Sequence, residues 1–183
     1  MKCYGAKELA ESFRTVRKNT IQIAEEIPEN KYEFRAAPEI RTVAQMLAHI
    51  ALATRLQQYT HERKVTDMRT VPWADIFREF TAEEAKPRTK ADLLSFLKSE
   101  GETYAKFLDG LSDSFLDETV TLMPGAQPAT KSRFEMILGA KEHEMHHRAQ
   151  LMLIERMIGL VPHLTRQMQE RMAAMSAAAQ PQR

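Results

Sequence analysis

Residues 141–150 read Lys-Glu-His-Glu-Met-His-His-Arg-Ala-Gln, in the middle of a helical pattern that runs from Lys131 to Ile158. His143 and His147 are four residues apart, so an α-helix places them on one face, about one turn from each other. The same face carries four apolar residues: Met136, Ala140, Leu151 and Ile154. This stretch therefore predicts a helix that turns two histidines toward the protein core.

Three further segments show the helical spacing of apolar residues. They span residues 6–27, 43–61 and 90–111. Thr42 and Thr89 stand just before the second and third of these segments. Each threonine is followed three residues later by a side chain that completes a helix cap, Gln45 or Asp92. Together with the helix around His143, the chain has four long helices, which predicts an all-α fold.

Two longer connections separate these helices and carry short elements of their own. Residues 63–88 contain a short amphipathic piece at residues 76–80. Residues 112–129 contain Thr119-Val-Thr-Leu, which predicts one short strand or ribbon. A short extra helix is expected after Pro162. Four helices with long connections predict a four-helix bundle that is not a simple up-down meander.

We expect one domain over residues 5–165, because no repeat or change of composition divides the chain. The Ala-, Gln- and Pro-rich segment of residues 173–183 is expected to form a disordered tail. Lys and Arg number 26 and Asp and Glu number 25, so the net charge is +1. This balance gives no electrostatic argument for nucleic acid or for an acidic membrane surface as a partner.

Cysteine use and hydropathy indicate the cellular compartment. Cys3 is the only cysteine, so the chain cannot form an internal disulfide. The N-terminal residues lack the apolar run of a signal peptide, and no stretch approaches the roughly 20 apolar residues of a membrane span. We therefore expect a cytoplasmic protein.

Two imidazoles one turn apart on a helix, such as His143 and His147, can bind one metal ion, and His49 offers a third ring for it. His49 lies close to an apolar stripe of its helix and should also face inward. The stripe comprises Met46, Ala53 and Leu56. Three neutral imidazoles with an open fourth position form a catalytic or substrate-binding metal site. A buried histidine needs only hydrogen-bond partners, however, so His49 could instead be a core residue.

The same stretch permits two other interpretations. His143 to His147 also reads H-E-x-x-H, the zinc-protease motif, in which Glu144 would be the general base acting on a metal-bound water. The extended form of that motif is absent, because Gln150 occupies its glycine position. Glu144 and His147 also form an E-x-x-H pair, as in di-iron bundles. A di-iron site needs a second such pair, but the residue three positions before His49 is Met46 and not a glutamate. We exclude the di-iron site and keep the peptidase as the less favoured alternative.

The order of these motifs resembles the DinB-like proteins, which include YfiT-type metal-dependent hydrolases and thiol-dependent transferases. The resemblance covers about residues 9–162 and rests on three places. The first is Tyr32-Glu-Phe-Arg, which leads through Pro38 and Thr42 to Leu47-Ala-His49-Ile. The second is His143-x-x-x-His147-Arg148-Ala149-Gln150. The third is Gly159 followed by Pro162. Ala149 stands where the family usually has glycine, a change that affects helix packing and should not remove a metal.

The resemblance implies an up-down-down-up four-helix bundle in which His49, His143 and His147 bind one divalent metal ion, usually zinc or nickel. It also implies a homodimer. The expected reaction is hydrolysis of a small-molecule substrate or transfer of a low-molecular-weight thiol. The alternative is a non-catalytic binding or stress-response module, in which the metal only offsets the burial of three histidines.

Several residues near the histidines are candidates for supporting roles. Glu144 is expected to be catalytic through a hydrogen bond to a metal-bound water. Arg148 and Gln150 are expected to orient an imidazole or a substrate. A basic pocket would favour a transferase that uses an acidic thiol. The arginines that could form such a pocket are Arg41, Arg55 and Arg148.

Overall fold

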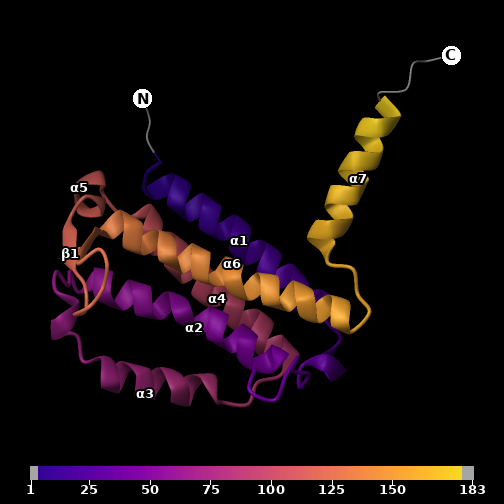
Figure 1. The fold of residues 1–183 in the computed structure, drawn as a ribbon, viewed down its shortest axis with the longest axis horizontal. Coiled ribbons are helices and arrows are strands. Elements are labelled where there is room, and N and C mark those ends of the chain that lie inside the picture. The colour runs from indigo at the N-terminus through magenta and orange to yellow at the C-terminus, as the bar shows by residue number, and fades with distance from the viewer. Residues whose placement is uncertain (1–3, 179–183) are drawn as a thin grey trace.

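The computed structural model of the protein describes residues 4–178 and is built around four long helices that lie side by side (Figure 1). They are α1 (Ala6–Glu26), α2 (Val43–Glu62), α4 (Lys90–Asp109) and α6 (Arg133–Met157). Each begins and ends within two residues of the range that the apolar spacing predicts. The all-α four-helix bundle expected from the sequence is confirmed.

The four helices do not simply alternate in direction. In Figure 1, α1 and α6 run one way along the bundle, and α2 and α4 run the opposite way, which is the up-down-down-up order. This order requires a crossover, because α2 and α4 start at the same end. The helix α3 (Trp73–Glu84) provides the crossover by running back along the outside of α2. The connection between α2 and α4 thereby covers one flank of α2.

Side-chain caps fix where three of the long helices begin. Thr42 Oγ1 accepts a hydrogen bond from the Gln45 backbone N at 3.2 Å, and Gln45 Oε1 accepts from the Thr42 N at 3.0 Å. Thr89 and Asp92 form the same reciprocal pair at the start of α4. A third cap starts α6 at Ser132, which the sequence analysis did not single out. Each pair satisfies two backbone N–H groups that a helix start would otherwise leave without partners.

Two clusters of buried apolar side chains fill the bundle, one toward each end. The larger joins α1, α2, α4 and α6 and includes Ile23, Ile27, Leu47, Ile50, Leu97 and Leu151. The other joins α1, α4 and the first half of α6 and includes Leu9, Phe13, Tyr104, Leu108 and Ile137. Each large aliphatic side chain buried in this way contributes about 1.5–3 kcal/mol. These clusters hold the four helices in fixed positions.

A buried ion pair joins all four helices near the middle of the bundle. Arg17 on α1 donates from Nε to Glu144 on α6, at 2.9 Å to Oε1 and 3.1 Å to Oε2. Its Nη1 donates to the Leu97 carbonyl on α4 at 2.8 Å, and its Nη2 donates to the Ile50 carbonyl on α2 at 3.2 Å. Gly101 on α4 leaves room for this side chain, because a Cβ there would lie 2.7 Å from Arg17 Cγ.

The connections carry the short elements. The strands β1 (Thr119–Thr121) and β2 (Thr130–Ser132) form the expected ribbon, antiparallel and with Thr119 opposite Ser132. The remaining short elements are α5 (Asp113–Leu116) and two 3-10 turns, η1 (Glu29–Lys31) and η2 (Met68–Thr70). The crossover helix α3 extends beyond the piece of residues 76–80 that the sequence predicts.

The last helix, α7 (His163–Ala178), leaves the bundle after a turn at Gly159 and points away from it (Figure 1). Gly159 has a φ of +87°, which is a conformation that favours glycine. The sequence predicts a short helix here and a disordered tail from residue 173. The helix instead continues through Ala178, because Ala and Met favour the helical state. Residues 179–183 of the expected tail lie outside the described residues.

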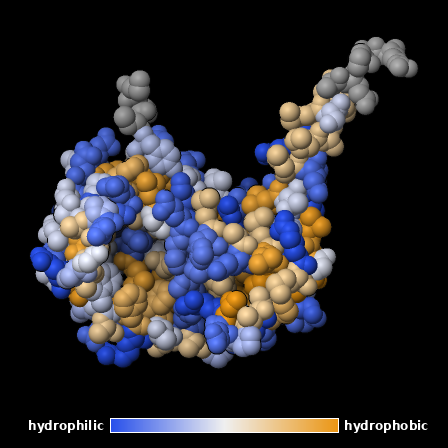
Figure 2. Space-filling model, viewed as in Figure 1, coloured by the Kyte–Doolittle hydropathy of each residue, from blue (hydrophilic) through white to orange (hydrophobic). Residues whose placement is uncertain are grey.

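Apolar side chains gather on the surface of α7 and of the neighbouring end of α6 (Figure 2). Their exposed fractions are 57% for Leu153, 51% for Met157, 57% for Met168, 52% for Met172 and 67% for Met175. Within residues 4–178, no helix combines the length and the apolar character that crossing a membrane requires.

Candidate metal centre

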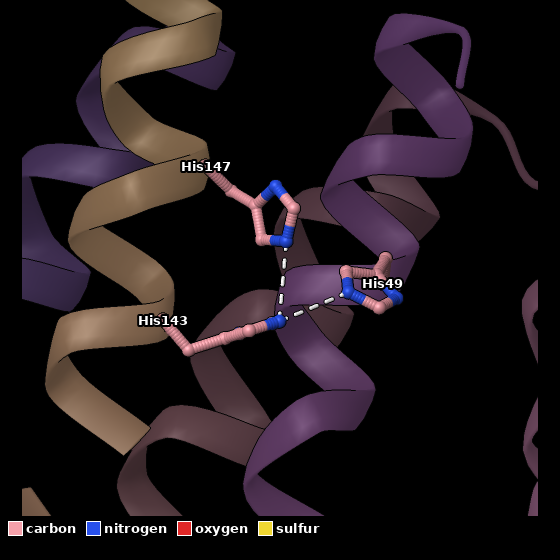
Figure 3. A group of neighbouring side chains, drawn as sticks. All are labelled: His49, His143 and His147. Carbon is pink, nitrogen blue, oxygen red and sulfur yellow. Dashed lines mark hydrogen bonds between the residues drawn. The ribbon is translucent and has the colours of Figure 1, made fainter. Parts of the chain in front are cut away.

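The three histidines that the sequence analysis singled out meet between α2 and α6 (Figure 3). His49 lies on α2, and His143 and His147 lie one turn apart on α6. The Nε2 atom of His143 is 3.1 Å from the Nε2 atom of His49 and 3.1 Å from that of His147. Ligand atoms of all three rings lie within 4.8 Å of one another. The bundle thus brings together side chains that are up to 98 residues apart in the sequence.

These separations fit a shared metal ion. Nitrogen ligands of one tetrahedral zinc ion, each about 2.0–2.1 Å from the metal, lie roughly 3.3 Å apart. The Nε2 atom of His143 lies 3.1 Å from that of His49 and 3.1 Å from that of His147, close to this value. His143 Nε2 carries at most one hydrogen, so it cannot donate to both neighbours. A cation among the rings would satisfy all three lone pairs at once.

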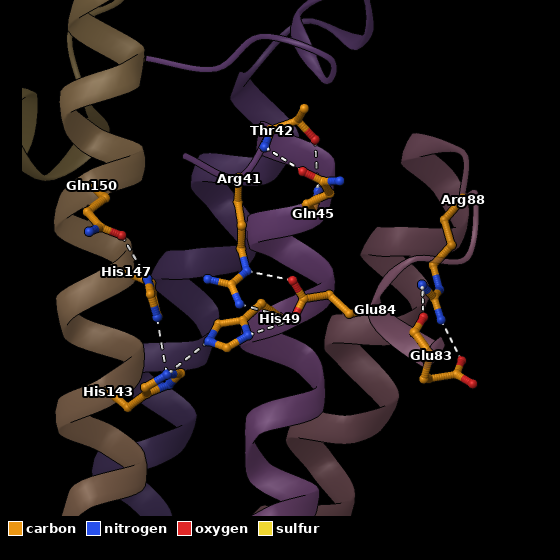
Figure 4. Close-up of polar contacts among 10 residues, drawn as sticks. All are labelled: Arg41, Thr42, Gln45, His49, Glu83, Glu84, Arg88, His143, His147 and Gln150. Atoms are coloured by element: carbon orange, nitrogen blue, oxygen red, sulfur yellow. Dashed lines mark hydrogen bonds and ion pairs between the residues drawn. The ribbon is translucent and has the colours of Figure 1, made fainter. Parts of the chain in front are cut away.

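Two of the rings have a fixed acceptor on the opposite nitrogen (Figure 4). His49 Nδ1 donates to Glu84 Oε2 at 2.9 Å, and His147 Nδ1 donates to Gln150 Oε1 at 2.7 Å. An ionised carboxylate only accepts hydrogen bonds, so the His49 proton sits on Nδ1 and Nε2 presents a lone pair. Histidines that bind a metal through Nε2 use this tautomer. His143 Nδ1 is buried and has no hydrogen-bond partner in the described part of the chain.

The environment favours the neutral form of all three imidazoles. Burial lowers the pKa of His143 to about 4, and the charges of the two neighbouring rings act in the same direction. Burial also lowers the pKa of His49 and of His147, although the hydrogen bond from each ring to its acceptor opposes this. The positive charge of Arg41 lowers the pKa of each ring further. Neutral imidazole is the form that binds metals, so the rings can bind one near neutral pH.

Glu84 is a site residue that the sequence analysis missed. It is the last residue of α3, and its carboxylate accepts from Arg41 Nε at 2.5 Å as well as from His49. Burial raises the pKa of Glu84, but the hydrogen bonds from Arg41 and His49 outweigh it and lower the pKa overall. Phe80, one turn earlier on α3, meets the His49 ring edge-on at 5.6 Å. The crossover helix therefore supplies one wall of the site.

An open cleft of about 580 Å³ lies beside His147. Its lining includes Arg35, Glu39, Arg41, Glu84, His147 and Gln150. A smaller cleft of about 250 Å³ shares Gln45 and Glu84 with it. A larger cleft of about 820 Å³ lies around the start of α1 and α5, and no histidine lines it. Only the first of these clefts reaches one of the three rings, through His147.

Of the other predicted site residues, some lie beside the histidines and others do not. Gln150 contacts His147, as described above. Glu144 lies in the buried pair with Arg17, because neighbouring residues on a helix point about 100° apart and residue 144 faces α1. Arg148 is half-buried, makes no hydrogen bond within residues 4–178, and has its pKa lowered by burial. Arg55 pairs with a glutamate of α4 and lines none of these clefts. The roles expected of Glu144, Arg148 and Gln150 stay predictions.

Comparison with solved structures finds similar folds. YfiT from Bacillus subtilis, described as a probable metal-dependent hydrolase with an unusual four-helix bundle topology, has a TM-score of 0.65 and 13% identity over 87% of this chain and 91% of its own. YjoA, a DinB-like protein from the same organism, has a TM-score of 0.62 and 21% identity over 83% of this chain and 92% of its own. A Streptococcus pneumoniae protein has a TM-score of 0.61 and 17% identity over 85% of this chain and 93% of its own. No curated protein matches this chain.

Sequence comparison assigns the family. A model of the DinB superfamily matches residues 12–151, which is more than half of the chain. The matched range includes the four long helices up to the second half of α6, and it contains all three histidines of the cluster. The structural similarities agree with this match in fold. The chain therefore belongs to the DinB superfamily.

Proposed function

We propose that the protein binds one divalent metal ion, zinc or nickel, through the Nε2 atoms of His49, His143 and His147, and hydrolyses a small-molecule substrate there. The observation that carries the proposal is the convergence of three neutral rings, two of them held in the metal-binding tautomer by Glu84 and Gln150. Three imidazoles leave a further coordination position for water or substrate. The description of YfiT as a probable metal-dependent hydrolase supports the same class of reaction.

A divalent metal held by His49, His143 and His147 would supply a Lewis acid, and zinc in such sites lowers the pKa of a coordinated water to about 7. The protein's own residues prepare the site for it. Glu84 and Gln150 fix the orientation of two rings, and Arg41 holds Glu84 through a second hydrogen bond. The cleft beside His147 gives a small molecule access to the ring cluster.

The contacts of Glu144 favour a structural role over the catalytic role expected from the H-E-x-x-H motif. Both carboxylate oxygens accept from Arg17, and the side chain is only 2% exposed. A peptidase of that class needs this carboxylate beside the metal-bound water. The same contacts therefore argue against the peptidase alternative.

Transfer of a low-molecular-weight thiol is the second candidate reaction. Arg35 and Arg41 line the cleft, and arginines there suit a thiol that carries acidic groups. Arg148, half-buried on α6, is a proposed further contact for such a thiol. The remaining alternative is a metal-stabilised binding module without turnover.

We also propose that the protein forms a homodimer through α7. Only the first residues of α7 contact the bundle, and Met168, Met172 and Met175 are exposed along one side of it. An isolated helix of this length is marginally stable in water. A second copy that covers this methionine stripe would account for both features.

The metal ligands can be tested by substitution. We expect the wild type to bind one zinc or nickel ion per chain, and His49→Ala, His143→Ala and His147→Ala each to reduce this toward zero, as measured by elemental analysis after dialysis. His146→Ala is the matched control, because His146 is exposed on the same helix and lies outside the three-histidine cluster, although it contacts the Gln150 amide at 3.3 Å and the edge of the His147 ring at 5.0 Å. Full metal retention in His49→Ala would contradict the three-histidine site.

Cobalt substitution separates the enzyme from the binding module. An accessible coordination position predicts that the visible spectrum of the cobalt protein changes with pH and with added ligands. A spectrum that responds to small thiols would favour thiol transfer over hydrolysis. A closed tetrahedral spectrum that no ligand changes would contradict both reactions and support the module.

A further inference from the structure

We propose that Arg41 and Arg35 form an anion-binding subsite beside the three histidines, so that the ligand of this cleft carries a carboxylate or a phosphate group. This inference rests on the proposed metal site and goes beyond it, because it assigns a charge to the ligand. Both arginines line the cleft of about 580 Å³ together with His147 and Gln150. A molecule bound in this cleft beside His147 would have both arginine side chains among its neighbours.

Arg41 has hydrogen-bond donors left for a ligand. Its Nε donates to Glu84 Oε1 at 2.5 Å and its Nη2 donates to Oε2 at 3.4 Å. No acceptor in residues 4–178 bonds its Nη1 atom, and the side chain is 40% exposed. Figure 4 shows the guanidinium between Glu84 and His147. Glu84 therefore holds the guanidinium in place while donors remain free to bind a carboxylate or phosphate in the planar geometry that arginine provides.

Arg35 adds a second guanidinium at the same cleft. Its side chain donates from Nη1 to the Pro38 carbonyl at 3.1 Å, which is an interaction within its own connection. Arg35 is exposed and forms no ion pair with any carboxylate of the described residues. It is therefore free to contact an anion in the same cleft.

The charge balance of the cleft points the same way. Its lining has two arginines and two glutamates, Glu39 and Glu84, so their formal charges cancel. Neutral imidazoles do not offset the charge of a divalent ion. A metal bound by the three rings would therefore leave about two positive charges in excess beside a partly desolvated cleft, and an anionic ligand is the complement of that charge.

Calorimetry of the metal-loaded protein measures anion binding at the cleft, and the Arg41 variants then separate binding by arginine from coordination of the anion to the metal. The probes are malonate, inorganic phosphate and uncharged malonamide. We expect malonate or phosphate to bind and malonamide not to bind, and the stronger of the two anions identifies the anionic group that the site prefers. Failure of both anions to bind more tightly than malonamide would overturn the proposal.

The contribution of Arg41 is measured with Glu84 neutralised, because Arg41→Gln alone would leave Glu84 as an unbalanced negative charge. We expect Glu84→Gln/Arg41→Gln to bind the anion about 10- to 100-fold more weakly than Glu84→Gln, both at saturating metal. Arg55→Gln is the matched control and should bind like the wild type, because Arg55 lies outside the cleft and pairs with Glu100 at 2.6 Å. Equal anion affinities in the single and double variants would overturn the proposal.

The metal site and the anion subsite can fail separately. If the wild type takes up no metal, the proposed function fails. Titration of the metal-free chain with the same anions, followed by the NMR signals of arginine Nε–H groups, then decides the subsite. Shifts of the Arg41 signal that are lost in Arg41→Gln support the subsite without the metal, and the absence of any shift overturns it.

Discussion

His49 and His147 each direct one ring nitrogen at the histidine cluster and have the other held by an acceptor. For His147 the acceptor is Gln150, on the same helix. For His49 it is Glu84, on the crossover helix α3 and itself held by Arg41. Outer partners of this kind fix the orientation and the tautomer of a ligand, so their loss should weaken metal binding without removing a ligand.

Glu84→Ala should weaken metal affinity by about 10- to 100-fold, because His49 loses the acceptor that holds its proton on Nδ1. Glu84→Gln should have a smaller effect, since the amide oxygen still accepts. Competition with a chelator measures both. Glu83→Gln is the matched control, because the Glu83 side chain bonds Lys86 and Arg88 and does not contact His49 (Figure 4). An unchanged affinity in Glu84→Ala would mean that His49 does not need this partner.

Glu144→Gln should retain one metal per chain but lose about 3–5 kcal/mol of stability, because Arg17 would remain buried without its ionic partner. Urea unfolding and elemental analysis measure the two quantities. Glu142→Gln, an exposed position on the same helix, should change neither. Unchanged stability together with loss of hydrolysis would instead support the catalytic role expected from the motif.

At the scale of the elements, the far end of α6 carries an unusual buried acid. Glu155 is 0% exposed, and neither of its carboxylate oxygens has a hydrogen-bond partner within residues 4–178. Burial, and then the nearby charge of Glu26, raises its pKa from 4.5 to about 7, while Arg166 and Arg156 act against this. The folded protein therefore keeps a proton that the unfolded chain releases, so this group makes stability fall as pH rises from about 4.5 to 7.

Glu155→Gln should remove that pH dependence. The difference in unfolding free energy between pH 5 and pH 8 should change by about 1–3 kcal/mol relative to the wild type, in the direction that favours the variant at pH 8. Urea unfolding of the metal-free protein at the two pH values measures it. Glu142→Gln again serves as the control. The same pH difference in Glu155→Gln and in the wild type would show that Glu155 ionises normally.

The elements also show where sequence reasoning succeeds. The long helices were predictable because each has a buried stripe, and reciprocal caps at Thr42 and Thr89 fix two of their starts. The crossover helix α3 has an apolar side but no fully buried residue, and only its residues 76–80 were predicted, as a short amphipathic piece. Glu84 stands at its end, and it meets His49 only because α3 docks on α2. The pairing of His143 with His147 could be predicted from their spacing along one helix. The contact between His49 and Glu84 could not, because it depends on tertiary packing.

For the whole molecule, the exposed methionine stripe of α7 predicts the state of association. If a second copy covers the stripe, Met172→Lys should convert a dimer into a monomer at micromolar concentration, because it places a charge in an apolar interface. Sedimentation velocity measures this. Met123→Lys is the control, since Met123 is 46% exposed but lies outside α7. A wild type that sediments as a monomer would rule out the homodimer.

The proposed ligands also lie far apart in the order of synthesis. His49 belongs to the second helix of the chain and His143 to the last helix of the bundle, 94 residues later. At about 5–20 residues per second, a ribosome needs roughly 5–20 s to make the chain between them. During that interval the nascent chain has one of the three rings and no site. Metal uptake should therefore mark the completion of the bundle, and a chain that ends before α6 should bind none.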